Sequence, residues 1–248
     1  LHRRHQGRRG GHGGTGLLKN GISPEKSYFE CPDCEDRGYT ATRSETGELM
    51  TRICPCQIRK DNQRRIARSG LSGLLESCTL ETYQTAEPWQ TQAKQMAEEY
   101  ITDWRGKWFY AGGTPGSGKT HLCTAICGKL MEAGLPVRYM QWRSDIPSIK
   151  AKVNDAELYA DAVGKLKTIR VLYIDDFLKG NVTEADRNIA FDLLNARYIK
   201  PECATIISSE RTIGQILDWD EAIGSRIAER AKGFTMSVTG SGKNWRLR

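Results

Sequence analysis

The stretch Gly113-Thr-Pro-Gly-Ser-Gly-Lys-Thr120 decides the fold of this chain. It fits the pattern G-x-x-x-x-G-K-[ST], a loop whose backbone N–H groups surround the phosphates of a nucleoside triphosphate. The apolar run Trp108-Phe-Tyr-Ala111 before it indicates a strand, and Leu122, Ile126 and Leu130 after it have the spacing of a buried helix face. Such a loop gathers N–H donors and the positive end of a helix dipole at one point. The sequence therefore predicts a phosphate-binding loop; the alternative is an ordinary glycine-rich turn that contains Lys-Thr.

The loop assigns a role to each of its residues. Lys119 is expected to reach the β- and γ-phosphates of ATP, and the Thr120 hydroxyl is expected to hold Mg²⁺. The residues predicted to contact the nucleotide are Gly113, Thr114, Pro115, Gly116, Ser117, Gly118, Lys119, Thr120 and His121.

A second landmark is Val171-Leu-Tyr-Ile-Asp-Asp176, four apolar residues that end in two acids. This pattern indicates a buried strand that delivers carboxylates to its C-terminal edge, where α/β sheets bind ligands. We expect Asp175 to hold the Mg²⁺ through water and Asp176 to orient or deprotonate the attacking water. Alone, the pattern is more often an ordinary strand end, but here it follows a phosphate-binding loop.

From about residue 80 the pattern alternates between helix and strand, which predicts an α/β fold with a parallel sheet covered on both faces. Thr183-Glu-Ala-Asp186 is typical of a helix N-cap. Besides the strand at 108–111, we expect strands at 137–140, 171–176 and 204–207 and helices at 88–104, 119–133, 144–153 and 155–167.

Polar groups near the C-terminus add candidates for the same site. Ser208-Ser-Glu210 follows a predicted strand and would emerge beside the γ-phosphate, unless it is an ordinary loop. Arg226 and Arg230 are four residues apart, on one helical face. They could form surface salt bridges, or they could reach the γ-phosphate of a neighbouring subunit.

The eight cysteines, in a chain without a visible secretory signal, suggest a reducing compartment such as the cytoplasm. Cys31, Cys34, Cys54 and Cys56 resemble a four-thiolate zinc site. Between the two pairs, two short strands indicate a hairpin of zinc-ribbon type, with too little apolar surface to fold without metal. The alternative is four reduced, unligated thiols. The remaining four are interpreted as buried small hydrophobes: Cys78, Cys123, Cys127 and Cys203.

The net charge of +7 is located mostly in the N-terminal segment, residues 1–27, which carries six Lys or Arg and one Glu. This segment is either a disordered basic tail or a stretch that does not belong to the native protein. We expect a zinc knuckle at 28–58, a basic linker at 59–79 and an ATPase domain at 80–248. The linker is interpreted as a solvated tether or linker helix, with contact to phosphates or an acidic partner as the alternative. The sequence contains no run of 18 apolar residues, so we expect no membrane span.

With these motifs identified, the chain from Tyr28 to Arg248 resembles the DnaC/DnaI group of replicative-helicase loaders within the AAA+ ATPases, in their phage or prophage versions. The resemblance implies a five-stranded parallel sheet and assigns Walker A and Walker B roles to the loop and to the acid pair. It further implies that Ser209 (or Ser208) is the sensor I residue and that Arg246, in the closing Asn244-Trp-Arg246, is the sensor II arginine. Arg226 and Arg230 lie in the segment that supplies the arginine finger to a neighbouring subunit.

Helices at 143–167 fall where this group carries an insertion that contacts single-stranded DNA. Arg143, Lys150 and Lys152 would then contact phosphates, and Trp142 would offer a stacking surface. Two residues depart from the family pattern: Asp176 replaces a Glu, and Glu210 replaces an Asn. Both departures favour a switch that hydrolyses ATP slowly.

Three functions remain open from the sequence. The first is an ATP-switched loader that binds single-stranded DNA, assembles through arginine fingers and delivers a DnaB-type helicase. The second is an IstB-like transposition helper ATPase, which wraps duplex DNA. The third is a zinc-mediated adaptor whose nucleotide site is structural.

Overall fold

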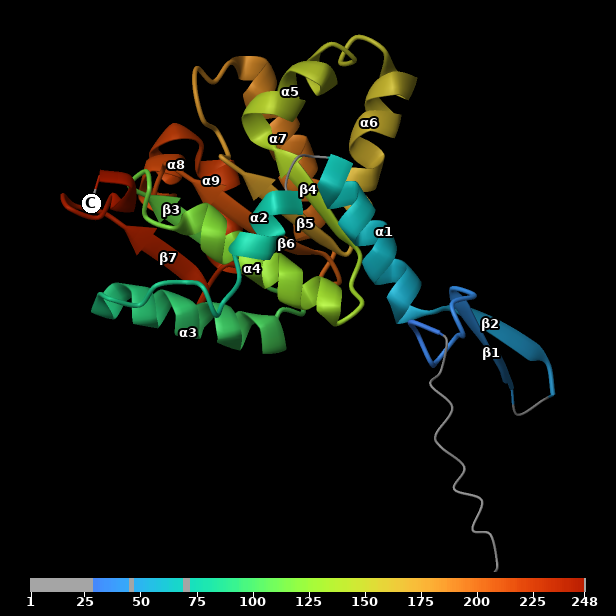
Figure 1. Ribbon diagram of the computed structural model, residues 1–248. Helices are drawn as coiled ribbons and strands as arrows, with labels where there is room; N and C mark the ends of the chain where they lie inside the picture. The colour runs from blue at the N-terminus through green and yellow to red at the C-terminus, as the bar shows by residue number, and fades with distance from the viewer. Residues whose placement is uncertain (1–28, 45–46, 69–71, 248) are drawn as a thin grey trace, which may run out of the picture.

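Five parallel strands form the centre of the molecule in the computed structural model (Figure 1), which describes residues 29–44, 47–68 and 72–247. The predicted disordered tail, residues 1–27, lies outside the described residues. The strands are β3 (Phe109–Gly113), β4 (Val137–Gln141), β5 (Val171–Asp175), β6 (Ala204–Ser209) and β7 (Thr235–Val238). Their spatial order is β4-β5-β6-β3-β7, which places the carboxyl ends of β3, β5 and β6 side by side. The predicted five-stranded parallel sheet is confirmed.

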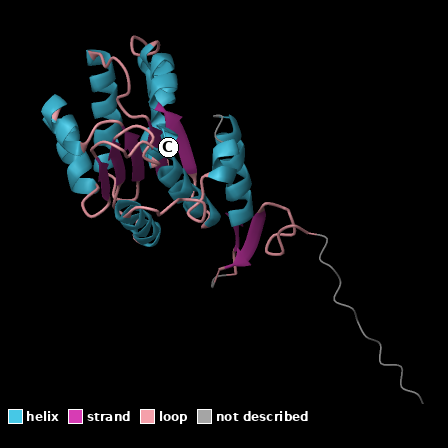
Figure 2. Ribbon diagram, turned by 60° about the vertical axis from the view of Figure 1, so that its left-hand side comes forward, coloured by secondary structure: helices cyan, strands magenta, loops and turns pink. Residues whose placement is uncertain are grey.

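Helices cover both faces of this sheet (Figure 2). They are α3 (Pro88–Thr102), α4 (Lys119–Glu132), α5 (Trp142–Lys150), α6 (Ala156–Thr168), α7 (Glu184–Tyr198), α8 (Ile213–Trp219) and α9 (Glu221–Arg230), followed by a short 3-10 helix at Trp245–Leu247. The predicted cap is present: Thr183 and Asp186 form a capping box at the start of α7.

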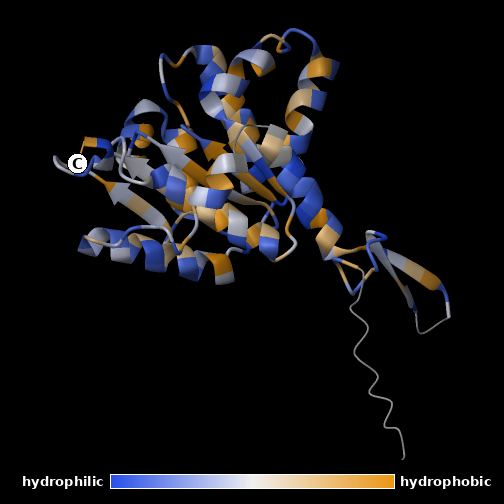
Figure 3. Cartoon of the chain, viewed as in Figure 1, coloured by the Kyte–Doolittle hydropathy of each residue, from blue (hydrophilic) through white to orange (hydrophobic). Residues whose placement is uncertain are grey.

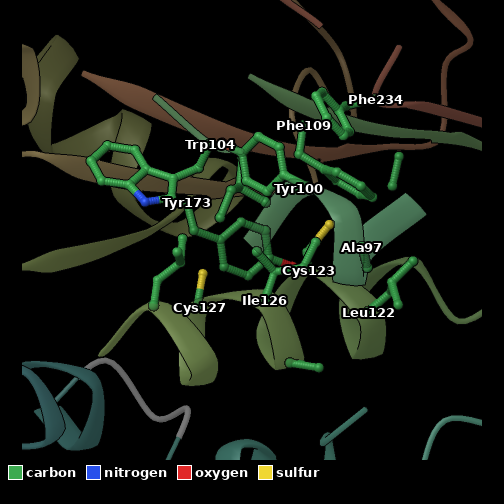
Figure 4. Close-up of a cluster of buried hydrophobic side chains, with 14 of the residues drawn as sticks. Ala97, Tyr100, Trp104, Phe109, Leu122, Cys123, Ile126, Cys127, Tyr173 and Phe234 are labelled. Carbon is green, nitrogen blue, oxygen red and sulfur yellow. The ribbon is translucent and has the colours of Figure 1, made fainter. Parts of the chain in front are cut away.

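The core consists of two hydrophobic layers, one on each face, because successive residues of a strand point in opposite directions. In β5, Tyr173 belongs to the layer beneath α3 and α4, whereas Leu172 and Ile174 belong to the layer beneath α5–α9. Figure 4 shows the first layer, where Cys123 and Cys127 pack among aromatic rings. All four cysteines predicted to be small buried hydrophobes are buried.

The N-terminal region is a two-stranded antiparallel hairpin of β1 (Tyr39–Arg43) and β2 (Leu49–Ile53), followed by α1 (Pro55–Arg68) and α2 (Ser72–Ser77). Figure 1 shows the hairpin projecting, at one end of α1, from the region that contains the central sheet. The buried Asn62 of α1 donates a hydrogen bond of 2.5 Å to the carbonyl of Leu135, between α4 and β4. Of the two forms expected for this segment, the structure has the linker helix and not the solvated tether: α1 packs on α4 and β4. The expected boundary between residues 58 and 59 falls inside it.

Trp142 does not offer the stacking surface that the sequence suggested. Its side chain is only 2% exposed, and its ring packs edge-on against Phe177 with centroids 4.9 Å apart. The first residue of α5 directly follows β4, so its side chain enters the core layer beneath that helix. No helix among the described residues combines the length and apolar character that a membrane crossing requires.

Candidate nucleotide-binding site

The glycine-rich loop joins β3 to α4, as predicted, and β7 fixes its first residues. The Thr114 N–H donates to the carbonyl of Val238 at 2.8 Å. Gly113 has a φ of 109°, and a Cβ atom there would lie 2.0 Å from the same carbonyl oxygen. Only glycine fits this close approach between β3 and β7.

The C-terminal segment lies over the middle of the loop. The Trp245 N–H donates to the carbonyl of Gly116 at 3.0 Å. A Cβ atom on Gly116 would lie 1.9 Å from Oδ1 of Asn244, so a side chain at this position would displace the segment. This contact brings Arg246 to the rim of the loop, where it lines the same cavity as Lys119.

Loop, acids and C-terminal segment enclose a cavity of about 520 Å³ at the carboxyl edge of the sheet. The Lys, Arg, Asp and Glu side chains of its lining are balanced, with three cations (Lys119, Lys179, Arg246) and three acids (Asp175, Asp176, Glu210). The other lining residues are Leu74, Cys78, Pro115, Gly116, Gly118, Thr120, His121, Tyr139 and Gln141. A larger cavity, about 610 Å³, lies at the opposite edge of the sheet and contains none of the predicted site residues.

Lys119 is almost fully buried, and its ammonium is held by the loop itself. Nζ donates to the carbonyls of Gly113 at 2.9 Å and Thr114 at 2.7 Å. Desolvation lowers the pKa of Lys119, although the nearby charges of Glu210 and Asp176 act in the opposite direction. A cation held in this way can exchange carbonyl oxygens for phosphate oxygens.

Asp175 is the most constrained carboxylate of the site. It accepts hydrogen bonds from the hydroxyls of Thr120 at 3.1 Å, Tyr139 at 3.1 Å and Tyr173 at 2.8 Å, and also from Ser208. Burial and the charge of Asp175 raise the pKa of both tyrosines, so their hydroxyls remain protonated donors. The adjacent oxygens of Thr120 and Asp175 are hard donors of the kind that Mg²⁺ prefers, so the site fits this ion.

The two serines after β6 have different partners. Ser208 contacts both acids, because its hydroxyl donates to Asp175 and accepts from the Asp176 N–H at 3.1 Å. Ser209 instead donates to the carbonyl of Phe177 at 2.8 Å and is not part of the cavity lining. Of the two serines that the sequence suggested, the structure therefore brings Ser208 to the acids.

The two candidate finger arginines do not line this chain's own cavity. Arg226 donates to Oδ1 of Asn195 at 3.0 Å, and its guanidinium lies 4.9 Å from the ring centroid of Phe191. Arg230 donates to the carbonyl of Gly106 at 2.8 Å and packs on the ring of Tyr198. Both arginines are partly exposed and anchored on the surface that α9 forms with α7.

His121 is near the loop but is held by the segment that precedes α3. Its Nε2 lies 2.9 Å from the carbonyl of Thr79, and its ring packs edge-on against Tyr83. The same ring borders a smaller cavity of about 310 Å³, which Gly116, Ser117 and Gly118 also line. The histidine therefore lies between the phosphate loop and the N-terminal side of the ATPase region.

The four cysteines of the hairpin region form a single buried cluster, with all four sulfur atoms within 4.8 Å of one another. The Sγ atoms of Cys31 and Cys54 are 3.8 Å apart, and those of Cys34 and Cys56 are 3.4 Å apart. Tetrahedral zinc with Zn–S bonds of about 2.3 Å requires sulfur separations of about 3.8 Å. The backbone N–H of Cys34 lowers the pKa of Cys31 to about 7, whereas the hydrogen bond with Cys34 raises the pKa of Cys56. The donor set thus fits a structural zinc ion.

Sequence reasoning missed three residues of the nucleotide site: Tyr139, Tyr173 and Lys179. Tyr173 lies two residues before Asp175 on the same face of β5, whereas only the register of β4 against β5 brings Tyr139 to Asp175. Lys179 follows the acid pair by three residues, a spacing that could have attracted attention, because a turn brings such a residue back towards the acids.

This fold and site define a P-loop nucleotide-binding protein of the α/β class. The sequence matches the family described as "IstB-like ATP binding protein" over residues 57–248, and the chain therefore belongs to that family.

Relatives of known name extend the comparison. The chain is 28% identical to the phage-like element PBSX protein XkdC of Bacillus subtilis, covering 88% of this chain and 85% of the relative. It is 24% identical to the replicative helicase loader DnaC of Escherichia coli, covering 68% and 69%. A crystal structure of the DnaC helicase loader shares the fold, with a TM-score of 0.54 and 17% identity over 64% of this chain and 94% of that one.

Proposed function

We propose that this protein is an ATP-dependent loader of a replicative, DnaB-type helicase. The observation that carries the proposal is the convergence of the phosphate loop, the acid pair and the C-terminal segment on one cavity. Likeness to helicase loaders in both sequence and fold supports the same conclusion. The site would act as a switch, with ATP bound in one state and ADP in the other.

In this proposal the loop residues hold the triphosphate and the acids handle its hydrolysis. Lys119 would contact the β- and γ-phosphates, and Thr120 and Asp175 would hold Mg²⁺, which would neutralise phosphate charge. Asp176 orients the attacking water and accepts its proton. Its side chain is one methylene shorter than that of the usual Glu, so we expect slow hydrolysis.

Assembly of several copies would complete the site. Arg246 would contact the nucleotide from its own chain, whereas Arg226 or Arg230 would reach the nucleotide of a neighbouring subunit. Either arginine must then give up the contacts that it makes with α7 in the single chain. Substitution of the finger should lower ATP hydrolysis without lowering ATP binding, since the finger acts on a different chain from the one that binds.

The hairpin offers a docking surface for the helicase. Tyr39 pairs with Ile53 and Arg43 pairs with Leu49, so these four side chains share one face. Tyr39 is 53% exposed, and Leu49 and Ile53 are each 67% exposed. Figure 3 shows hydrophobic residues on this hairpin although it projects from the rest of the chain. Zinc would hold this face in shape, and α1 would connect it to α4, the helix that begins at the phosphate loop.

Single-stranded DNA is the other proposed ligand. Arg143 of α5 is exposed, and Lys152 follows α5 with a partly exposed side chain, so both remain available to phosphates. Lys150 is less available, because its ammonium forms an ion pair of 2.7 Å with the buried Asp186. The proposed contact therefore uses phosphate-binding side chains without the stacking of Trp142.

A pull-down of the cognate replicative helicase tests the loader function. Wild-type protein should retain the helicase in an ATP-dependent manner, and Lys119→Ala should lose that dependence. Leu49→Asp should abolish retention of the helicase. Glu48→Ala is the matched control: it changes the residue directly before Leu49 but removes no apolar side chain from the surface, so retention should persist. Retention that is equal with and without ATP would favour the adaptor function instead.

The family match also favours a second candidate, an ATPase that wraps duplex DNA during transposition. Fluorescence anisotropy with single-stranded and duplex DNA of the same length separates the two candidates. A loader should prefer the single strand and hydrolyse ATP faster in its presence. Preference for the duplex would support the transposition function.

A further inference from the structure

The loop after β5 is held in an unusual backbone conformation. Asp176 and Leu178 have φ values of 54° and 58°, in the left-handed region that residues other than glycine rarely adopt. Between them, Phe177 is fully buried; its N–H donates to the carbonyl of Ser208 at 2.8 Å, and its carbonyl accepts from Ser209. Strain of this kind persists only where surrounding contacts fix it, and it concentrates at functional sites.

This conformation turns Lys179 back towards the acids. Its Nζ lies 3.3 and 3.2 Å from the two carboxylate oxygens of Asp176 and 3.1 Å from Oε1 of Glu210. Its side chain is 30% exposed and lines the cavity that also contains Lys119. Desolvation lowers the pKa of Lys179, but the bonds to Glu210 and Asp176 raise it overall, so the ammonium remains charged.

The charges of the cavity indicate what this ammonium faces. Asp176 and Glu210 are two carboxylates that line the same cavity as Lys119, whose ammonium is expected to contact the terminal phosphate. Two acids alone would repel that phosphate, and Lys179 lies between them as their shared counter-ion. A phosphate that carries more negative charge than either carboxylate can draw the ammonium towards itself.

We propose that Lys179 contacts the terminal phosphate of a bound nucleoside triphosphate and makes the cavity select triphosphate over diphosphate. This inference rests on the proposed nucleotide-binding function. When Lys179 moves to the phosphate, both oxygens of Asp176 become free to accept hydrogen bonds from the attacking water. Lys179 thus couples the presence of the terminal phosphate to the availability of the proposed base.

The test is the ratio of two dissociation constants, for Mg²⁺–ADP and for a non-hydrolysable ATP analogue with Mg²⁺, measured by calorimetry on the full chain. Wild type should prefer the triphosphate. Lys179→Met should reduce that preference about tenfold or more, as expected for a lost charge-assisted hydrogen bond, and should change ADP affinity less than twofold. Lys179→Arg should keep part of the preference. Lys232→Met, which removes an exposed lysine beyond α9, should change neither constant.

A double variant separates direct contact from general charge. Lys179→Met with Glu210→Gln restores the balance of charge but not the ammonium, so the loss of preference should persist. Recovery of the wild-type ratio in the double variant would overturn the proposed contact, as would an unchanged ratio in Lys179→Met. If wild type bound neither nucleotide, the nucleotide-binding function itself would be refuted, and the inference with it.

Discussion

The N-terminal hairpin and the central sheet are both built from β-strands, but they bury their side chains by different means. Every residue of β3 and β5 is buried, and two layers of apolar side chains cover the sheet. In β1 and β2 almost every residue is exposed, and the buried cluster nearby consists of four cysteines. The hairpin therefore lacks the apolar burial that stabilises the sheet, and we propose that a bound metal replaces it.

This difference separates two kinds of dependence within one chain. The region around the central sheet depends on packing, and the loss of any one contact there costs a small part of the total free energy of unfolding. In this proposal the hairpin depends on one coordinated ion, since structural zinc contributes on the order of 10–16 kcal/mol in small domains. Loss of the ion should unfold the hairpin and leave the ATPase region folded.

Removal of the metal ligands should have the largest effect. In Cys31→Ser with Cys34→Ser, we expect loss of bound zinc and unfolding of residues 29–54, because two thiolates cannot complete the tetrahedral shell. Metal analysis and hydrogen exchange would measure both changes, while nucleotide affinity should stay within about twofold of wild type. Cys203→Ala, which removes a buried cysteine outside the cluster, is the matched control. Unchanged zinc content in the double variant would contradict the metal site.

The contact between α1 and the region around the central sheet should be less sensitive to substitution than the metal site. Asn62→Ala removes the buried donor to the Leu135 carbonyl and leaves that acceptor unsatisfied, which costs about 1–3 kcal/mol. Hydrogen exchange should rise along α1, and helicase retention should lose its ATP dependence if α1 transmits the switch. Gln63→Ala, an exposed neighbour on the same helix, should leave both unchanged. Equal protection of α1 in wild type and Asn62→Ala would show that the contact does not depend on this bond.

Within the ATPase region a single lost hydrogen bond should matter least. Tyr139→Phe removes one of the donors to Asp175 while the ring stays packed, so the cost is about 1 kcal/mol, or a several-fold reduction in kcat. Steady-state ATPase assays would detect it. The control is Tyr110→Phe. The hydroxyl of Tyr110 also belongs to a buried side chain of the sheet, but it donates to the backbone carbonyl of Arg211 and not to Asp175. A larger loss in Tyr110→Phe than in Tyr139→Phe would indicate that stability, not positioning of Asp175, explains the effect.

Much of the ATPase fold could be predicted because its signals are local. The loop at 113–120 lies between a strand and a helix, and the apolar run at 171–174 leads into its acids, as the pattern required. The strand β7 was not located, because its four residues, Thr235–Val238, are too short a run for their alternation of polar and apolar side chains to identify a strand. The sequence likewise identified the cysteine cluster, whose spacing alone indicates a metal.

What the sequence could not provide are contacts that depend on register and packing. Trp142 was interpreted as a stacking surface because it lies beside the segment where the resembling family contacts DNA, yet the position directly after β4 places it in the core. The choice between Ser208 and Ser209 depends on which way each side chain leaves β6, a property that a two-residue alternation fixes only once the sheet is known. Tyr139 of β4 reaches Asp175 of the neighbouring strand β5, and no pattern within one segment can reveal such a contact.

The central claim is that a triphosphate with Mg²⁺ occupies the cavity between the glycine-rich loop and the acid pair. A crystal structure of the full chain grown with Mg²⁺ and a non-hydrolysable ATP analogue tests it most directly. We predict phosphates on the loop amides with Lys119 beside them, and Mg²⁺ near Thr120 and Asp175. An analogue bound elsewhere, or a loop closed against phosphate at saturating concentration, would contradict the account.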